Sequence, residues 1–286
     1  MITATKISEV RAAVREWKQQ GFTVGLVPTM GYLHDGHASL VDCASSMCDK
    51  VVVSDFVNPT QFSPADDLEA YPRDFEHDCE ILRKHNCDMV FYPSVDEMYP
   101  DGNGKTDTYV EILNDMTSQL CGKSRPGHFR GVCTVVSKLF NIVMPDKAFF
   151  GEKDAQQLAV IRRMTRDMSY GTEIVGCPIV READGLAKSS RNTYMNTDER
   201  KAAQVLYRAL QAGKNAIDAG ATDSNKVTGI IQQVIDAEPM AVTDYVSIVD
   251  GITMMPADEI SDGTLIAIAV YIGKTRLIDN FTYHSR

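Results

Sequence analysis

Continuous apolar runs rich in β-branched and aromatic residues alternate with helix-patterned segments through the first two-thirds of the chain. Strands that are covered on both faces have this pattern. We predict strands at Val24–Val27, Val51–Phe56, Met89–Tyr92, Ala148–Phe150 and Glu173–Gly176. Because helices between successive strands favour parallel pairing, the pattern predicts an α/β fold with a doubly wound parallel sheet.

The segments between these runs have helical spacing of apolar residues. We predict helices at Gly36–Met47, Phe75–His85, Val132–Met144 and Ala155–Met168. The first twenty residues also have amphipathic helix spacing, without the apolar middle of a signal peptide.

The pattern changes after Cys177-Pro178. A polar, glycine-containing segment is followed by two predicted helices and then by three predicted strands. The helices lie near 198–219 and 224–237, and the strands at 245–249, 265–271 and 276–281. We therefore predict two domains, residues 1–177 and 178–286, the second a smaller α+β domain that acts as a lid over the strand ends where ligands bind.

Composition excludes several classes of protein. The longest apolar run, Leu265–Ile272, is far shorter than the ~20 residues that cross a bilayer, so we predict a cytoplasmic protein without membrane contact. The formal charge of −10 disfavours a nucleic-acid partner. The seven cysteines include no C-x-x-C pair, which excludes zinc-ribbon and thioredoxin interpretations.

A His-x-Gly-His segment follows the first predicted strand. His34 and His37 are three residues apart, so both imidazoles lie on one side of a first helical turn. Helix N-termini attract phosphate, and Gly31 and Gly36 leave room for a nucleotide near the backbone. The position after a buried strand favours a phosphate site over two ordinary loop histidines.

Three further segments are weaker signals. Lys188-Ser189-Ser190-Arg191 can fold over a polyphosphate, although such a sequence alone is typical of a surface turn. Lys153 follows a buried strand, where it faces either a ligand cleft or solvent. The amides of Asn58 and Gln61 suit a hydroxylated or carboxylate substrate, or a structural turn.

Two other segments give no clear functional signal. Arg125–Gly131, with two arginines and a histidine, is either an anion site or a tethered loop. Arg73 and Asp74 favour a helix start over a binding role.

Taken together, these motifs resemble the pantoate–β-alanine ligase (pantothenate synthetase) family. Each motif is short, and their order and spacing make the resemblance specific. The motifs are Pro28–Gly31, His34-x-x-His37, Phe56–Pro59, Gln61-Phe62, Tyr71–Arg73, Arg125–Val132, Phe150–Leu158, Ser189–Asn192 and, more weakly, Arg276–Asn280.

The resemblance implies a Rossmann-like domain with a lid, a homodimer, and membership of the His-x-Gly-His nucleotidyltransferase group. It implies ATP-dependent condensation of (R)-pantoate with β-alanine, giving pantothenate, AMP and pyrophosphate through a pantoyl adenylate. Mg²⁺ should accompany ATP, bridging phosphates rather than sitting in a protein cage.

The resemblance also assigns roles to residues. Those assigned to catalysis are His37 as proton donor, His34, Lys153, Ser189, Ser190 and Arg191. Those assigned to ATP are Met30, Gly31, Tyr32, Leu33, His34, Asp35, Gly36, His37, Gly151, Glu152, Lys153, Asp154, Val180, Lys188, Ser189, Ser190 and Arg191. Those assigned to pantoate are Gln61, Gln157 and Met30, with Gln61 also near β-alanine. No metal ligand is assigned.

The chain departs from the family pattern at two places. Leu120-Cys121-Gly122 stands where the family often has Leu-Glu-Gly, and Lys188 stands where an apolar residue is common.

Three other functions remain as alternatives to the ligase. One is a related nucleotidyltransferase acting on a phosphorylated substrate. A tRNA-charging enzyme fits less well, because of the negative charge and the short remainder of the chain. The last is a nucleotide-binding protein without catalysis.

Overall fold

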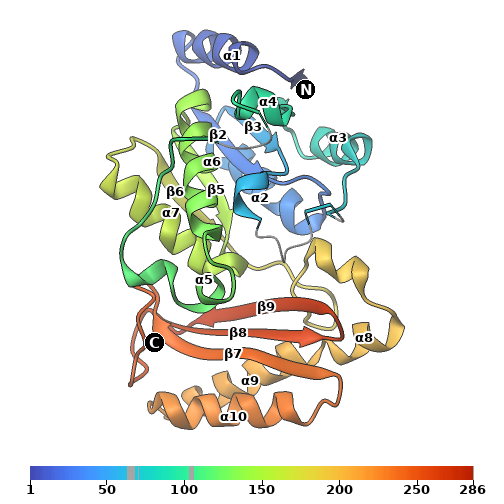
Figure 1. Ribbon diagram of the computed structural model, residues 1–286, viewed down its shortest axis with the longest axis vertical. Coiled ribbons are helices and arrows are strands. Elements are labelled where there is room, and N and C mark those ends of the chain that lie inside the picture. Colours follow the sequence, from blue (N-terminus) through green and yellow to red (C-terminus); the bar gives the residue numbers. More distant parts are fainter. Residues whose placement is uncertain (63–67, 70, 103–105, 286) are drawn as a thin grey trace. The chain divides into compact units, whose positions relative to one another are not determined.

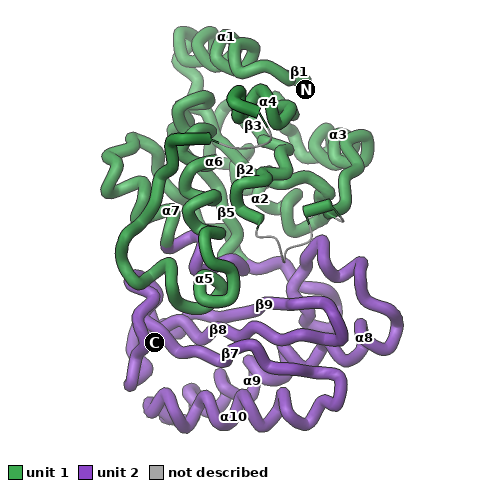
Figure 2. The backbone as a smooth tube through the Cα atoms, in the orientation of Figure 1, with its two compact units in different colours: residues 1–152, 160–178 green, residues 153–159, 179–286 purple. Residues whose placement is uncertain are grey.

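The computed structural model describes residues 1–62, 68, 69, 71–102 and 106–285. The chain divides into two compact units (Figure 2), residues 1–152 with 160–178, and residues 153–159 with 179–286. All seven cysteines are free. No helix among the described residues is both long and apolar enough to cross a bilayer.

The first unit is built on a six-stranded sheet in which every strand pair is parallel (Figure 1). In sheet order the strands are β1 (Ile2–Ala4), β4 (Met89–Phe91), β3 (Lys50–Asp55), β2 (Val24–Thr29), β5 (Lys147–Gly151) and β6 (Glu173–Cys177). The chain order reverses at β2, which pairs with β3 on one side and β5 on the other. Ligands of doubly wound sheets bind at the carboxyl ends of the strands beside such a reversal.

Helices cover both faces of this sheet. The helices between residues 7 and 167 are α1 (Ile7–Gln19), α2 (Asp35–Met47), α3 (Phe75–Lys84), α4 (Val95–Met98), α5 (Leu120–Ser124), α6 (His128–Val143) and α7 (Ala155–Asp167), and residues 155–159 of α7 belong to the second unit. Short 3-10 turns are η1 (Pro59–Gln61), η2 (Asp115–Thr117) and η3 (Glu152–Asp154). Val27 and Val53 pack in one cluster with residues of α2 and α3, whereas their neighbours Leu26 and Val52 point to the other face, as the strand pleat requires.

The second unit has an antiparallel sheet and a helical layer. Its strands are β7 (Ala241–Asp250), β8 (Thr264–Ile272) and β9 (Thr275–Thr282), with β8 in the middle. Its helices are α8 (Thr197–Ala202), α9 (Val205–Asp218) and α10 (Ser224–Asp236), preceded by the 3-10 turn η4 (Ser190–Tyr194). One core cluster joins Leu206 and Leu210 of α9 and Ile231 of α10 to Ile266 and Ile268 of β8.

The predicted fold class, a doubly wound parallel sheet followed by a smaller α+β part, is confirmed. Three local predictions differ from the structure. Residues 2–4 form the edge strand β1 instead of the start of a helix, since only Ala4 of the three is buried and no alternation marks the strand. The helix predicted from Val132 begins at His128, after Gly127 at φ +81°. The helix predicted near 198–219 is two helices, because the N–H of Gln204 bonds to Lys201 in a tighter turn.

The predicted domain boundary lay after residue 177. The two units meet in sequence at 178/179, and the short segment 153–159 groups with the second unit. One reason is a hydrogen bond from the Asn280 side-chain amide on β9 to the carbonyl oxygen of Lys153, at 2.8 Å.

Two helical glycines give opposite expectations on substitution by alanine. A Cβ at Gly131 in α6 would collide with the backbone of Thr60 and lie 2.6 Å from the Cα of Gln61, whereas one at Gly229 in α10 meets nothing within 4 Å. We expect Gly131→Ala to lower the free energy of unfolding by about 1–3 kcal/mol. Gly229→Ala should raise it by up to about 1 kcal/mol, because alanine favours helix. Urea denaturation measures both, and a stabilised Gly131→Ala would contradict the close approach.

Candidate active site

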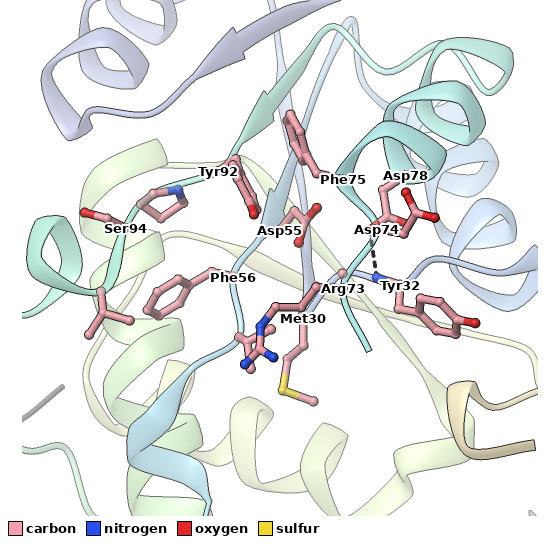
Figure 3. A pocket seen from close by; sticks show the side chains of 14 residues that line it. Met30, Tyr32, Asp55, Phe56, Arg73, Asp74, Phe75, Asp78, Tyr92 and Ser94 are labelled. Carbon is pink, nitrogen blue, oxygen red and sulfur yellow. Dashed lines mark hydrogen bonds between the residues drawn. The ribbon is translucent and has the colours of Figure 1, made fainter. Parts of the chain in front are cut away.

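A tight turn between β2 and α2 is formed by the residues that precede His34. Gly31 and Tyr32 both have left-handed backbone, with φ of +76° and +51°. The carboxylate of Asp78, on α3, accepts the N–H group of Tyr32 at 2.7 Å (Figure 3) and that of Leu33 at 2.6 Å. A side chain at Gly31 would collide with the Asp55 carboxyl group. The turn therefore requires glycine there and is held in place by a buried acid.

The two histidines cap the helix that follows this turn. The Gly36 N–H donates to His34 Nδ1 at 3.1 Å, and the His34 N–H donates to His37 Nδ1 at 3.3 Å. The two rings lie 4.1 Å apart between centroids. Since each Nδ1 accepts a hydrogen bond, the neutral rings carry their protons on Nε2. Both Nε2–H groups are thus donors at the positive end of α2, which is a suitable place for phosphate oxygens.

Asp55, at the end of β3, forms a buried pair with Asp78. Burial, then the charge of Asp78 and a hydrogen bond with its side chain, raises the pKa of Asp55 to about 7. Burial also raises the pKa of Asp78, but the N–H groups of Leu33 and Tyr32 act in the opposite direction. Below about pH 7 the proton shared by the two acids therefore lies on Asp55, and Asp78 is the acceptor of the turn.

The acid pair lines a cavity of about 210 Å³ beside the turn. Figure 3 shows Met30 and Tyr32 of the turn on the same cavity as Arg73 and the two acids. Asp74 caps α3 by accepting the His77 N–H at 3.1 Å, as the predicted helix start requires. Arg73 lines the cavity, although sequence reasoning assigned it no binding role, and its guanidinium also bonds to the Tyr71 carbonyl at 2.9 Å.

Gln61, in η1, is the centre of a buried polar network. Its Oε1 accepts from Asn58 Nδ2 at 3.0 Å, and its Nε2 lies 3.2 Å from the sulfur of Met30. Tyr99 in turn donates to Asn58 Oδ1 at 2.7 Å. Asn58 thus orients Gln61, while Met30 and Gln61, both assigned to pantoate by the resemblance, lie in contact.

The segment 125–131 contacts the same glutamine. His128 Nδ1 lies 2.8 Å from the Gln61 carbonyl oxygen, and Arg125 Nη1 lies 3.3 Å from His128 Nε2. Of the two interpretations that the sequence left open, these contacts favour a tether that holds the backbone of η1.

The remaining predicted residues lie mostly in the second unit. Lys153 and Asp154 belong to η3 and Gln157 to the first turn of α7, directly after Gly151 and Glu152 of the first unit. Residues 180–188 form a hairpin in which the Lys188 N–H donates to the Val180 carbonyl at 2.9 Å. Ser189 caps η4 by accepting the N–H of Arg191 at 3.3 Å.

The residues assigned to ATP are therefore divided between the units. Residues 30–37, with Gly151 and Glu152, belong to the first unit, and Lys153, Asp154, Val180 and residues 188–191 to the second. Sequence reasoning missed Asp55, Asp78 and Tyr99. An aspartate that ends a continuously apolar strand, as Asp55 does, was the one available signal.

Comparisons with known proteins agree over nearly the whole chain. The family model described as pantoate-beta-alanine ligase matches residues 2–282. Pantothenate synthetase from Enterococcus faecalis is 54% identical over 283 residues, covering 99% of each chain. The pantothenate synthetase of Clostridium acetobutylicum is 53% identical over 280 residues, covering 97% of this chain and 98% of its own.

Solved structures give the same result for the fold. Pantothenate synthetase from Thermus thermophilus has a TM-score of 0.93 at 44% identity, with both chains fully covered. A pantoate-beta-alanine ligase from Francisella tularensis, complexed with beta-gamma ATP and beta-alanine, has a TM-score of 0.81 at 36% identity, covering 99% of this chain and 97% of its own.

The acid pair predicts a pH effect on stability. In the unfolded chain Asp55 ionises near 3.8, whereas in the folded protein its pKa is about 7. Its contribution to stability is therefore complete below about pH 4 and is lost as pH rises through 7. Asparagine does not titrate and keeps a donor for Asp78. We expect Asp55→Asn to gain stability relative to the wild type between pH 5 and pH 8, by roughly 2–3 kcal/mol, because the wild type loses about 1.4 kcal/mol per pH unit from pH 5 up to the folded pKa of about 7.

Urea denaturation at several pH values measures this difference. Asp49→Asn is the control, because hydrogen bonds from Thr23 lower the pKa of Asp49 and its effect lies below pH 4. A difference between Asp55→Asn and the wild type that stays constant from pH 5 to pH 8 would refute the shared proton.

Proposed function

We propose that this chain, which belongs to the pantoate–β-alanine ligase family and condenses pantoate with β-alanine using ATP, does so through a pantoyl adenylate. A carboxylate does not react with an amine at neutral pH, because its carbonyl carbon is poorly electrophilic and the amine is mostly protonated. Attack of the pantoate carboxylate oxygen on the α-phosphorus of ATP breaks the bond to pyrophosphate and leaves an acyl-AMP. The β-alanine amine then attacks the acyl carbon, forms the amide and releases AMP.

The observation that carries this proposal is the geometry of His34 and His37. Both rings have Nδ1 occupied by a backbone N–H, so both are oriented before any nucleotide binds. Negative charge moves onto the β-phosphate oxygens as pyrophosphate leaves. Donors that are already oriented stabilise this charge without reorganisation, and the proton-donor role assigned to His37 would be that of an Nε2–H hydrogen-bond donor to the leaving pyrophosphate.

Pantoate binding is assigned to Gln61, Gln157 and Met30, and Gln61 is also assigned to β-alanine. The fixed orientation of Gln61 supports this assignment, since Asn58 donates to its side-chain oxygen and Tyr99 in turn holds Asn58. An amide offers a donor and an acceptor, which suits the hydroxyl and carboxylate groups of pantoate.

The second unit supplies the cations of the proposed mechanism. Lys153, Lys188 and Arg191 would contact phosphate oxygens, with hydroxyl donors from Ser189 and Ser190. Nucleotide contacts are assigned to the rest of the set, namely Met30–Leu33, Asp35, Gly36, Gly151, Glu152, Asp154 and Val180.

Mg²⁺ is proposed to accompany ATP, where it neutralises phosphate charge. No group of three or more His, Cys, Asp or Glu in the described part of the chain is arranged to hold a metal ion. As the resemblance implies, the ion would be held chiefly through the phosphates of ATP. The homodimer and the cytoplasmic location are proposed on the family resemblance.

Exchange of labelled pyrophosphate into ATP tests the adenylate directly. With Mg²⁺ and without β-alanine, we expect exchange that depends completely on pantoate. Exchange without pantoate, or none while β-alanine still drives AMP release, would overturn the two-step mechanism.

His37→Ala should reduce pantoate-dependent exchange by roughly 10²–10⁴-fold, because the leaving group loses its donor. His85→Ala is the matched control, since His85 pairs with Asp42 at the surface at 2.8 Å. A folded His37→Ala enzyme with wild-type turnover would exclude this role.

Gln157→Ala should weaken pantoate binding much more than ATP binding, because only the acid loses a hydrogen-bond partner. Isothermal titration with each substrate alone measures the two dissociation constants. Equal losses for both would show that Gln157 is misplaced.

A further inference from the structure

Two adjacent polar residues of β9, Asp279 and Asn280, are buried. Their exposed fractions are 2% and 5%. A buried polar group costs free energy unless it is hydrogen-bonded, so the hydrogen-bond partners of Asp279 and Asn280 show which segments the two residues hold in place. The segment was part of the weak C-terminal motif, and the proposed mechanism gives it no role.

Asp279 binds a single arginine with both carboxylate oxygens. Arg181 Nη1 and Nη2 donate to them at 2.6 and 2.9 Å, and Nη1 also donates to the Gly185 carbonyl at 3.0 Å. The guanidinium lies 5.0 Å from the ring centroid of Tyr207 on α9. Gly185 has φ +93°, and a side chain there would collide with the same ring.

Arg181 therefore fixes the hairpin that leads into Lys188. Within it the Glu182 N–H donates to the Leu186 carbonyl at 2.8 Å, and the Lys188 N–H to the Val180 carbonyl at 2.9 Å. The hairpin ends directly at residues 188–191. The ion pair between Asp279 and Arg181 thus holds the hairpin, and the hairpin in turn positions the segment 188–191 that is assigned to phosphate.

Asn280 reaches the other segment. Its Nδ2 donates to the carbonyl oxygen of Lys153 at 2.8 Å, across 127 positions of sequence. In the register with β8, Asp279 is opposite Ile268 and Asn280 is opposite Ala267. Successive strand residues point to opposite faces, so one dipeptide holds a different segment from each face of the sheet.

We propose that Asp279 and Asn280 are positioning residues that together set the Lys153 and Lys188–Arg191 segments for ATP. This inference rests on the proposed roles of those cations. Neither residue touches substrate in this scheme. Asp279 acts through Arg181 on the hairpin, and Asn280 acts through the backbone of Lys153.

The test uses a second aspartate–arginine pair of the same sheet as its control. Arg276 Nε and Nη2 donate to Asp244 at 3.0 and 2.6 Å, and this pair joins β9 to β7. Asp279→Asn and Asp244→Asn each remove the carboxylate partner of one arginine in the second unit, and Asp279 is the more buried of the two. A purely structural role predicts lost stability in both variants, without a selective loss of ATP-analogue binding in Asp279→Asn.

We expect Asp279→Asn to weaken binding of a non-hydrolysable ATP analogue about tenfold while the pantoate dissociation constant stays unchanged. Asn280→Ala should weaken binding of the analogue to a similar degree. It should also weaken binding of pantoate, to a smaller degree, because Gln157 follows Lys153 on the same segment. Asp244→Asn should change neither constant. Arg181→Lys keeps the charge but loses the two-pronged contact, and provides a milder variant if Asp279→Asn fails to fold.

Three outcomes would overturn the inference. The first is that the folded variants bind the analogue as tightly as the wild type does. The second is that Asp279→Asn loses equal affinity for the analogue and for pantoate. The third is that Asp279→Asn and Asp244→Asn change the dissociation constant of the analogue equally. Wild-type protein without pantoate-dependent pyrophosphate exchange would instead count against the proposed mechanism, so the two failures are distinguishable.

Discussion

The hydrogen bonds from Tyr32 and Leu33 to the Asp78 carboxylate are the contacts on which the first unit's site depends. Two successive residues with left-handed backbone cost free energy, above all at Tyr32, which has a side chain. A buried carboxylate that accepts two N–H groups compensates for this cost. The turn sets where α2 begins, and the start of α2 sets the orientation of both histidines.

The same arrangement recurs around three side chains of the first unit that are assigned to substrate. His34 and His37 are oriented by backbone N–H groups, and Gln61 by Asn58, which Tyr99 holds in place. In every case the supporting residue satisfies one polar atom and leaves the group's direction fixed. Catalysis by oriented donors gains from such support, since little rearrangement remains to be made as charge develops.

The sequence predicted those parts of the molecule whose signals are local. Continuous apolar runs located β2 to β6, and a His-x-Gly-His after the first of them located the start of α2. The Asp55–Asp78 pair was not predictable, because its members are distant in sequence and meet only through the packing of β3 and α3. The bond between Asn280 and Lys153 was not predictable for the same reason, because the two residues are distant in sequence. The strand β1 was not predictable either, because its three residues show almost no pattern of apolar and polar positions.

A buried aspartate is stabilised differently in the two units. Asp279 faces a guanidinium, so a full positive charge accompanies its negative one. Asp78 faces backbone dipoles and a second acid, and the opposite charge is replaced by a shared proton. Backbone N–H groups stabilise a carboxylate less than an arginine side chain would. These N–H groups belong to the turn, however, so their bonds to Asp78 also fix the conformation of the turn. An arginine beside Asp78 would satisfy the charge but compete with Tyr32 and Leu33 for their acceptor, so the acid pair is the arrangement that holds both the turn and the charge.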